Sequence, residues 1–100
     1  MKEPFYEYEI QGVNFIIPDY MASSIQLYLS HGIEPGSFLS AVICNDLSSA
    51  VGYADRTNLM NLPAYIGFFY NEAPSQSWGS KEKMVSWTKE KQEVIHDTST

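Results

Sequence analysis

The chain has 100 residues, of which 44% are hydrophobic and 14% aromatic, so it can bury one small core and has too many aromatic side chains for a disordered chain. A single cysteine excludes an internal disulfide and a cysteine-based zinc cage, and no apolar run approaches the roughly 20 residues that a membrane span needs. Six basic against twelve acidic side chains give a net charge of −6, which disfavours direct binding to nucleic acid because phosphates attract cations.

The first 17 residues predict a small β element. Residues 5–10 partly alternate apolar with acidic side chains, Gln11-Gly12 can turn the chain, and residues 13–17 are typical of a second strand. A lone hairpin is marginally stable in water. We therefore expect this β-hairpin or strand pair to pack on helices or to pair with another subunit.

Residues 18–92 predict a helical body that begins at Pro18, a residue suited to the first position of a helix. The first helix should run to about Ser30 and stop at Gly32, with His31 favourably placed at the negative end of the dipole. Two apolar arcs follow its surface. The arc predicted as core comprises Met21, Ala22, Ile25, Tyr28 and Leu29, and the second arc comprises Tyr20, Ser24, Leu27 and His31.

Two short helices should follow. Ser37 is the predicted N-cap of the first, and Asn45 should close it. Asp46 is the predicted N-cap of the second, which covers residues 47–54 and is weakened by Gly52. The face expected to turn inward comprises Phe38, Leu39, Val42 and Ile43.

A longer helix, capped by Asp55, should run from Arg56 to about Glu72 as the centre of the domain. Pro63 predicts either a kink or a later start at Leu62. The stripe at 3–4 spacing that we expect in the core comprises Leu59, Leu62, Ile66, Phe69, Tyr70 and Ala73, with Tyr65 at its margin and Phe68 opposite.

After a loop at residues 73–79, Ser80 should cap a last helix from Lys81 to about Gln92 whose Met84, Val85 and Trp87 face inward. Residues 93–100, including His96, should form a flexible polar tail. The expected architecture is therefore one α+β domain over residues 1–100, mostly α, with four to five short helices around a central helix and a small N-terminal β element.

The sequence carries no signature of known chemistry. It has no phosphate-binding glycine loop, no HExxH pair and no GxSxG elbow, so we predict no catalytic residue, no metal ligand and no cofactor. Cys44 lies beside Ile43 in an apolar helix and is interpreted as a buried, inert thiol.

Polar residues gather at the predicted helix junctions, where helix capping is their simplest role. The alternative is a pocket that recognises a small ligand or a partner, with Trp78 contributing an aromatic ring beside Tyr53, Tyr65 and Tyr70. A divalent cation held by Asp46, Asp55 and Glu72 is a further alternative, although the spacing matches no known loop. The junction residues are Asn45, Asp46, Asp55, Asn58, Asn71 and Glu72.

Charge is unevenly distributed along the chain. Between Glu3 and Ser80, eight acidic residues face a single basic residue, Arg56, while four lysines follow between Lys81 and Lys91. One interpretation is a solvated acidic surface that keeps the protein soluble. The other is an acidic face that docks on a basic partner.

A pattern from Ile17 to Trp87 resembles a family of small proteins carried by tailed bacteriophages and prophages. The resemblance implies an accessory protein made in the cytoplasm of an infected bacterium, and it carries over no catalytic residue. Its residues are Ile17-Pro18-Asp19-Tyr20-Met21, Tyr28, His31-Gly32, Pro35-Gly36-Ser37-Phe38-Leu39, Ala41-Val42, Asn45-Asp46-Leu47, Ala50, Gly52, Ala54-Asp55, Asn58, Tyr70-Asn71-Glu72-Ala73-Pro74 and Trp78-Gly79-Ser80.

The expected function is therefore stoichiometric and non-enzymatic: binding of a host defence protein, as an anti-CRISPR inhibitor does. Two alternatives stay open, a sponge that sequesters a nucleotide defence signal and a small metal-dependent hydrolase that uses Asp46, Asp55 and Glu72. We also expect a homo-oligomer, because Tyr20, Leu27, Tyr65 and Phe68 together exceed what one small core should cover.

Overall fold

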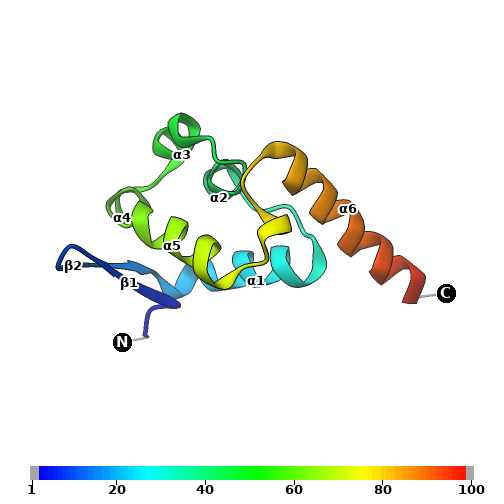
Figure 1. Ribbon diagram of the computed structural model, residues 1–100, viewed down its shortest axis with the longest axis horizontal. Coiled ribbons are helices and arrows are strands. Elements are labelled where there is room, and N and C mark those ends of the chain that lie inside the picture. Colours follow the sequence, from blue (N-terminus) through cyan, green and yellow to red (C-terminus); the bar gives the residue numbers. More distant parts are fainter. Residues whose placement is uncertain (1–2, 99–100) are drawn as a thin grey trace.

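The computed structural model describes residues 3–98, with side chains to residue 93, and shows a mostly helical α+β arrangement (Figure 1). Its strands and α-helices are β1 (Tyr6–Ile10), β2 (Val13–Ile17), α1 (Ala22–His31), α2 (Ser37–Ile43), α3 (Leu47–Tyr53), α4 (Arg56–Met60), α5 (Leu62–Glu72) and α6 (Lys81–Thr98). Two 3₁₀ turns, η1 (Asp19–Met21) and η2 (Ser75–Ser77), complete the order. The fold class is confirmed: the described residues contain six α-helices, against the expected four to five short helices around a central one.

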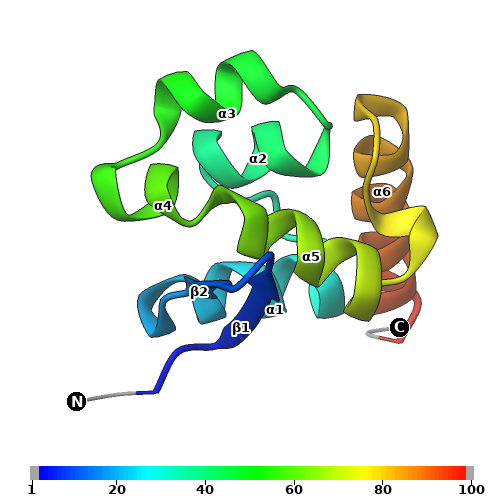
Figure 2. The ribbon, with the colours of Figure 1, turned by 60° about the vertical axis from the view of Figure 1, so that its left-hand side comes forward.

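β1 and β2 form the predicted antiparallel hairpin, in a register that pairs Tyr6 with Ile17 and Ile10 with Val13. Gln11 and Gly12 both have positive φ, 51° and 79°, which is the backbone of a two-residue turn that matches the twist of the strands. Figure 2 shows the hairpin lying along α5. The expectation that it packs on helices is confirmed.

Specific contacts hold the hairpin on α5. The rings of Phe5 and Tyr6 lie 5.3 Å and 5.4 Å from the ring of Phe68, centroid to centroid. The backbone N–H of Ile16 donates to Oδ1 of Asn61 at 2.9 Å, just before α5 begins. These contacts tie the N-terminal strands to a helix from the second half of the chain.

Most helix ends follow the predicted signals, but α1 begins at Ala22, after the 3₁₀ turn η1, and not at Pro18, whose backbone is extended. Gly32 ends α1 in the left-handed conformation, at φ 67°. The side chains of Asp46 and Asp55 accept hydrogen bonds from the N–H groups of Ser49 and Asn58. Ser80 Oγ accepts from the N–H of Lys83 at 3.1 Å.

A second exception is Ser37, the predicted N-cap of α2. Gly36 holds that position, and Ser37 is the first helical residue. Glycine is a tolerated N-cap because its extended backbone already directs its carbonyl into the first helical turn. The side chain that bonds at this end of α2 is Ser40, whose Oγ donates to the carbonyl of Pro35 at 3.0 Å.

The predicted long helix is divided into α4 and α5 at Asn61, whose φ of −113° is not helical. Pro63 lies in the first turn of α5, where its missing N–H leaves no helical hydrogen bond unmade. The later start at Leu62 is thus the correct one of the two alternatives. Asn61 Nδ2 donates to the carbonyl of Thr57 at 2.9 Å and closes α4.

The buried face of α5 is only partly the one that the spacing predicted. Phe69 is buried as predicted, but so are Tyr65 and Phe68, which lie outside the predicted stripe, whereas Ile66 and Tyr70 are exposed. The hairpin covers one side of α5, and Phe38 of α2 packs edge-on against Tyr65 at 5.1 Å. With neighbours on both of these sides, the ridge through Ile66 is left on the outside. Leu59, also expected in the core, is exposed on α4.

α6 closes the core from the other end of the molecule. Met84 and Trp87 are buried as predicted, but Val85 is 54% exposed and does not face inward. Trp87 Nε1 donates to the carbonyl of Tyr28 at 3.0 Å, and Gln92 Nε2 donates to the carbonyl of Gly32 at 2.9 Å. These bonds tie α6 to the C-terminal end of α1.

α6 continues to Thr98, beyond the end predicted near Gln92. Residues 99–100 of the predicted tail and the side chain of His96 lie outside the described residues. Within residues 3–98, no helix is long and apolar enough to cross a membrane.

Candidate functional site: a groove between α2, α3 and α6

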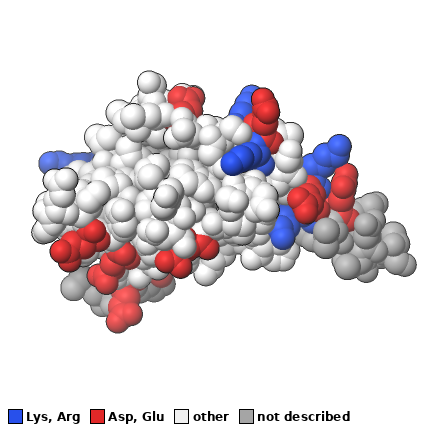
Figure 3. Space-filling model, in the orientation of Figure 1, with Lys and Arg blue, Asp and Glu red and all other residues white. Residues whose placement is uncertain are grey.

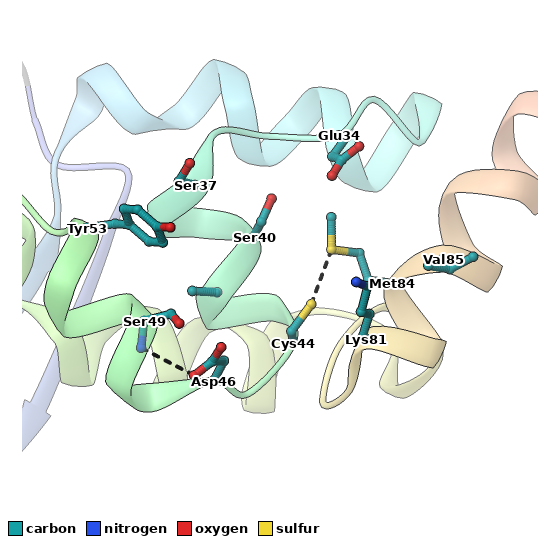
Figure 4. A pocket seen from close by; sticks show the side chains of 11 residues that line it. Glu34, Ser37, Ser40, Cys44, Asp46, Ser49, Tyr53, Lys81, Met84 and Val85 are labelled. Atoms are coloured by element: carbon teal, nitrogen blue, oxygen red, sulfur yellow. Dashed lines mark hydrogen bonds between the residues drawn. The ribbon is translucent and has the colours of Figure 1, made fainter.

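A groove of about 500 Å³ lies between α2, α3 and the start of α6 (Figure 4). Small side chains of α2 form its floor, α3 forms one wall and α6 the opposite wall, with Glu34 from the preceding loop at one end. The lining residues are Glu34, Ser37, Ser40, Ala41, Cys44, Asp46, Ser49, Tyr53, Lys81, Met84 and Val85.

The sequence of α2 explains the hollow. Residues three and four apart share a helix face, so Ser37, Ser40, Ala41 and Cys44 lie together, while the large side chains between them turn into the core. The Asp46 cap starts α3 directly after α2, and the two helices pack side by side. Small residues between two walls leave a space that larger ones would fill.

The groove presents hydroxyl groups and few charges. Ser37, Ser49 and Tyr53 offer hydroxyls along α2 and α3. Its charged residues are two acids, Glu34 and Asp46, against Lys81. An uncharged polar or weakly cationic group suits this lining better than an anion, because the carboxylates outnumber the ammonium group.

Two sulfur atoms meet at the boundary between α2 and α6. Sγ of Cys44 lies 3.5 Å from Sδ of Met84, with the thiol as donor. Burial raises the pKa of the Cys44 thiol above its ordinary value of 9.0, an effect that the nearby Lys81 only partly offsets. The thiol is therefore neutral at pH 7, as expected of an inert cysteine, although it is half-buried rather than buried.

Of the predicted site residues, only Asp46 lies in this groove. Asn45 stands between α2 and α3 with a positive φ of 62°, a conformation that asparagine tolerates better than most residues. It lines a separate shallow depression that also contains Leu47 and Ile66. Asn45 is therefore not part of the groove, although it precedes Asp46 directly in the chain.

Asp55 and Asn58 form a second polar group at the start of α4. Asp55 Oδ1 accepts from the Asn58 N–H at 2.7 Å, and Asp55 Oδ2 accepts from the Tyr20 hydroxyl at 3.0 Å. The buried side chain of Asn58 accepts from the Tyr65 hydroxyl at 2.5 Å and donates to Sδ of Met21 at 3.9 Å. Both predicted site residues have structural partners, which fits the capping interpretation.

Desolvation acts on the phenols of this group. Burial raises the pKa of Tyr65 well above its ordinary value of 10.0. The pKa of Tyr20 is also raised, first by partial burial and then by its hydrogen bond to the Asp55 carboxylate. Both hydroxyls therefore remain donors across the physiological pH range.

The remaining predicted site residues lie at the far end of α5. Asn71 and Glu72 are exposed in its last turn. Trp78 is half-buried, with its ring 5.9 Å from that of Phe69, and lines a shallow depression with Tyr70 and other residues. Trp78 thus contributes mainly to packing.

The three carboxylates considered for a cation are not brought together. Asp46 caps α3, Asp55 caps α4 and Glu72 ends α5. Among the described side chains, no group of three or more His, Cys, Asp or Glu residues is arranged to hold a metal ion. The separation has a simple cause, since each carboxylate belongs to the end of a different helix.

Sequence reasoning missed most of the groove. The small residues of α2 recur at helical spacing opposite its apolar face, and this spacing is the one local signal of the hollow. The wall from α6 has no such signal, because Lys81, Met84 and Val85 lie about forty residues further along the chain. Comparison with family models, with curated proteins and with solved structures finds no match.

Proposed function

We propose that this chain is a bacteriophage accessory protein that counteracts a bacterial defence by stoichiometric binding to a basic host defence protein. The observation that carries the proposal is the concentration of exposed acidic side chains at the hairpin end of the molecule. The phage setting is supported by the sequence resemblance, and the mode of action by the distribution of charge.

Acidic side chains with few basic neighbours are concentrated at the hairpin end, whereas α6 carries basic and acidic side chains together. Glu3, Glu7 and Glu9 are exposed on or next to β1. Asp19 is exposed in η1, shortly after β2, and Asp55 is exposed at the N-cap of α4. Figure 3 shows acidic residues gathered at this end, and most of the visible basic residues at the other, over α6, where acidic residues lie among them. A partner with a basic surface is therefore attracted toward the hairpin end.

The acidic end is held in a fixed shape. The hairpin is anchored to α5 by the aromatic contacts of Phe68 and by the bond from Ile16 to Asn61. Asp55 is held by its cap bond and by Tyr20. A preorganised surface loses less conformational entropy on binding, so more of the interaction energy contributes to affinity.

The groove provides the specific observation for a nucleotide sponge, since about 500 Å³ falls within the usual range for small-ligand sites. Its charges argue for the protein partner. Lys81 is the one cation of its lining against Glu34 and Asp46, whereas a nucleotide phosphate requires an excess of positive charge. A cavity of suitable size is thus paired with the wrong sign of charge for an anionic signal.

The test compares two double charge reversals with the same effect on net charge. Glu7→Lys with Glu9→Lys changes the hairpin end, and Glu82→Lys with Glu90→Lys changes exposed positions of α6. We expect the first pair to abolish protection of a phage plated on the defence-carrying host and the second to preserve it. The purified partner should bind the wild type at a fixed molar ratio. Its affinity for the wild type should fall by about tenfold or more as the salt concentration rises from low to several hundred millimolar.

Three results would overturn this function. Equal loss in both double variants would show that net charge, not the hairpin surface, is responsible. Accumulation of a product in molar excess over the protein would make it an enzyme. A co-purifying nucleotide that is lost on Lys81→Glu and unaffected by the hairpin variants would make it a sponge.

A further inference from the structure

The outer edge of β1 carries backbone groups that the hairpin itself does not use. Within the described residues, β1 and β2 form a two-stranded sheet, so each strand has one edge without a neighbouring strand. The turn at Gln11-Gly12 places Ile10 opposite Val13, and the residues that flank such a turn exchange hydrogen bonds. Because bonded and non-bonded pairs alternate along an antiparallel ladder, the N–H and C=O groups of Glu7 and Glu9 point away from β2.

The outer edge of β2 fits this alternation and is partly occupied. Ile16 lies opposite Glu7, and its N–H donates to Oδ1 of Asn61 at 2.9 Å and not to β1. The N–H of Glu7 therefore points in the opposite direction, to the outer side of β1. Among residues 3–93, none bonds the outward backbone groups of Glu7 or Glu9, and both residues are exposed. β1 thus presents two successive outward positions that are available to another strand.

We propose that an extended segment of the basic partner pairs with the outer edge of β1 as a third strand of the sheet. This inference rests on the function proposed above and states how the partner is held. An added strand gains affinity from main-chain hydrogen bonds and specificity from alternate side chains. Glu7 and Glu9 each offer one N–H donor and one C=O acceptor to such a segment.

The side chains of β1 select a segment that alternates basic with apolar residues. Glu7 and Glu9 lie on the exposed face of β1, so the residues of an added strand beside them are lysine or arginine. Tyr8, between them, lies on the opposite face, with its ring against Gly67 of α5. The rings of Tyr6 and Tyr8 are half-buried and 6.5 Å apart. An apolar residue between the two basic ones covers the part of these rings that is still exposed.

The surroundings of the β1 edge are also acidic. Glu3 is exposed just before β1, and Glu72 is exposed one helical turn after Phe68, the α5 residue that contacts the start of the hairpin. In the described chain before α6, the one lysine or arginine is Arg56. It belongs to α4, whose end at Asn61 lies beside β2. A basic segment is therefore attracted to the edge of β1 more than to the edge of β2.

The same charges exclude a second copy of this chain as the occupant. Two β1 strands paired antiparallel about Tyr8 would place Glu7 of one copy opposite Glu9 of the other. Like charges directly opposite each other are destabilising, so these carboxylates keep the edge from pairing with itself. A basic segment reverses the effect, because each carboxylate then lies beside a cation.

The probe for strand addition is a synthetic peptide of about nine residues that alternates lysine with valine. The control peptide has the same composition, with all of its lysines in one half. Fluorescence anisotropy measures the binding of each peptide to the full chain. We expect the alternating peptide to bind at least about tenfold more tightly, because its lysines and valines match the two faces of β1. Equal binding of the two peptides, or no binding of the alternating one, would overturn the inference.

A proline variant removes one outward N–H group and leaves the ladder intact. Proline is tolerated on an edge strand where its nitrogen faces outward, so Glu9→Pro deletes a bond to the added strand and none to β2. Glu9→Gln controls for the lost charge, and Asn14→Pro, opposite Glu9 on β2, controls for proline itself. We expect Glu9→Pro to bind the alternating peptide at least about tenfold more weakly than Glu9→Gln, and Asn14→Pro to bind it like the wild type. Circular dichroism checks that the variants are folded.

Hydrogen exchange followed by NMR needs no variant. In the wild type, the alternating peptide should slow exchange of the Glu7 and Glu9 amides by at least about tenfold and leave the Asn14 amide unchanged. Bound peptide without this protection would overturn strand addition. Equal peptide affinities of Glu9→Pro and Glu9→Gln would overturn it as well.

Failure of strand addition is distinguishable from failure of the proposed function. If Glu7→Lys with Glu9→Lys abolishes protection of the phage but Glu9→Pro protects it like Glu9→Gln, the function stands and strand addition is wrong. If the charge reversals leave protection of the phage intact, the function is wrong, and the basic partner of the added strand is wrong with it.

Discussion

At the scale of single residues, the polar side chains of the helix junctions act as structural partners. Asp46 and Asp55 each bond the N–H group three residues ahead, and Asn58 joins α4 to α5 through Tyr65. Asparagine and aspartate are common at such positions because their short side chains reach nearby backbone groups. Residue type alone therefore did not separate capping from recognition.

Asn58 gives the sharpest prediction at this scale. Asn58→Ala leaves the buried Tyr65 hydroxyl without its acceptor and should lower the free energy of unfolding by about 1–3 kcal/mol. The control is Asn71→Ala, an exposed position in the last turn of α5, which should change it by less than about 0.5 kcal/mol. Urea denaturation measures both. Equal effects would show that the hydrogen bond contributes nothing to stability.

At the scale of the elements, the close approach of the hairpin to α5 depends on a glycine. A Cβ atom added at Gly67 would lie 2.7 Å from ring carbons of Tyr8 in β1. Such a distance is too short for any real pair of non-bonded carbon atoms, so a larger residue there must displace the hairpin. Gly67 is thus required by packing, not by backbone conformation.

A pair of identical substitutions tests this requirement. Gly67→Ala should lower the free energy of unfolding by about 1–3 kcal/mol because the new methyl group forces Tyr8 away. Gly52→Ala in α3 has open space around its Cβ and should raise it by about 0.5–1 kcal/mol, the usual gain of alanine over glycine in a helix. Thermal unfolding distinguishes the two signs. A stabilising Gly67→Ala would mean that β1 is not held against α5.

At the scale of the whole molecule, two buried phenols connect distant parts of the fold. The Tyr28 hydroxyl of α1 donates to the carbonyl of Ser77 at 2.6 Å, and Tyr65 donates to Asn58. Burial raises the pKa of both phenols well above 10.0, their ordinary value. Their neutral forms are therefore part of the folded state.

The consequence is a loss of stability in alkali. The pKa of each phenol is higher in the folded state than in the unfolded state. The contribution of the neutral phenol to the stability of the fold is therefore complete below about pH 10, and it is lost as the pH rises from the unfolded-state pKa toward the folded-state pKa. Each phenol should lower the free energy of unfolding by about 1.4 kcal/mol per pH unit in this range. Urea denaturation from about pH 8 to about pH 11.5 spans the onset of this loss and measures the slope. The double variant Tyr28→Phe with Tyr65→Phe should reduce this slope, and an unchanged slope would contradict the assignment.

Most of the local structure of this protein can be read from its sequence. The hairpin, the stop at Gly32, the caps at Asp46, Asp55 and Ser80 and the break before Pro63 depend on interactions between residues close in the chain. Such signals are visible in a single sequence because each residue type has a direct conformational effect. The inward positions of Phe38, Met84 and Trp87 were also predicted, since each of their helices is apolar mainly on one side.

Long-range packing, in contrast, settled which side of α5 is buried and which residues share a groove. α5 is apolar around most of its circumference, so its 3–4 spacing favoured one stripe that contains both the buried Phe69 and the exposed Ile66 and Tyr70. The hairpin and α2 cover the side of Tyr65, Phe68 and Phe69 and leave Ile66 and Tyr70 exposed. The groove likewise joins α2 with Lys81 and Met84, whose proximity depends on contacts between distant segments and leaves no local pattern in the chain.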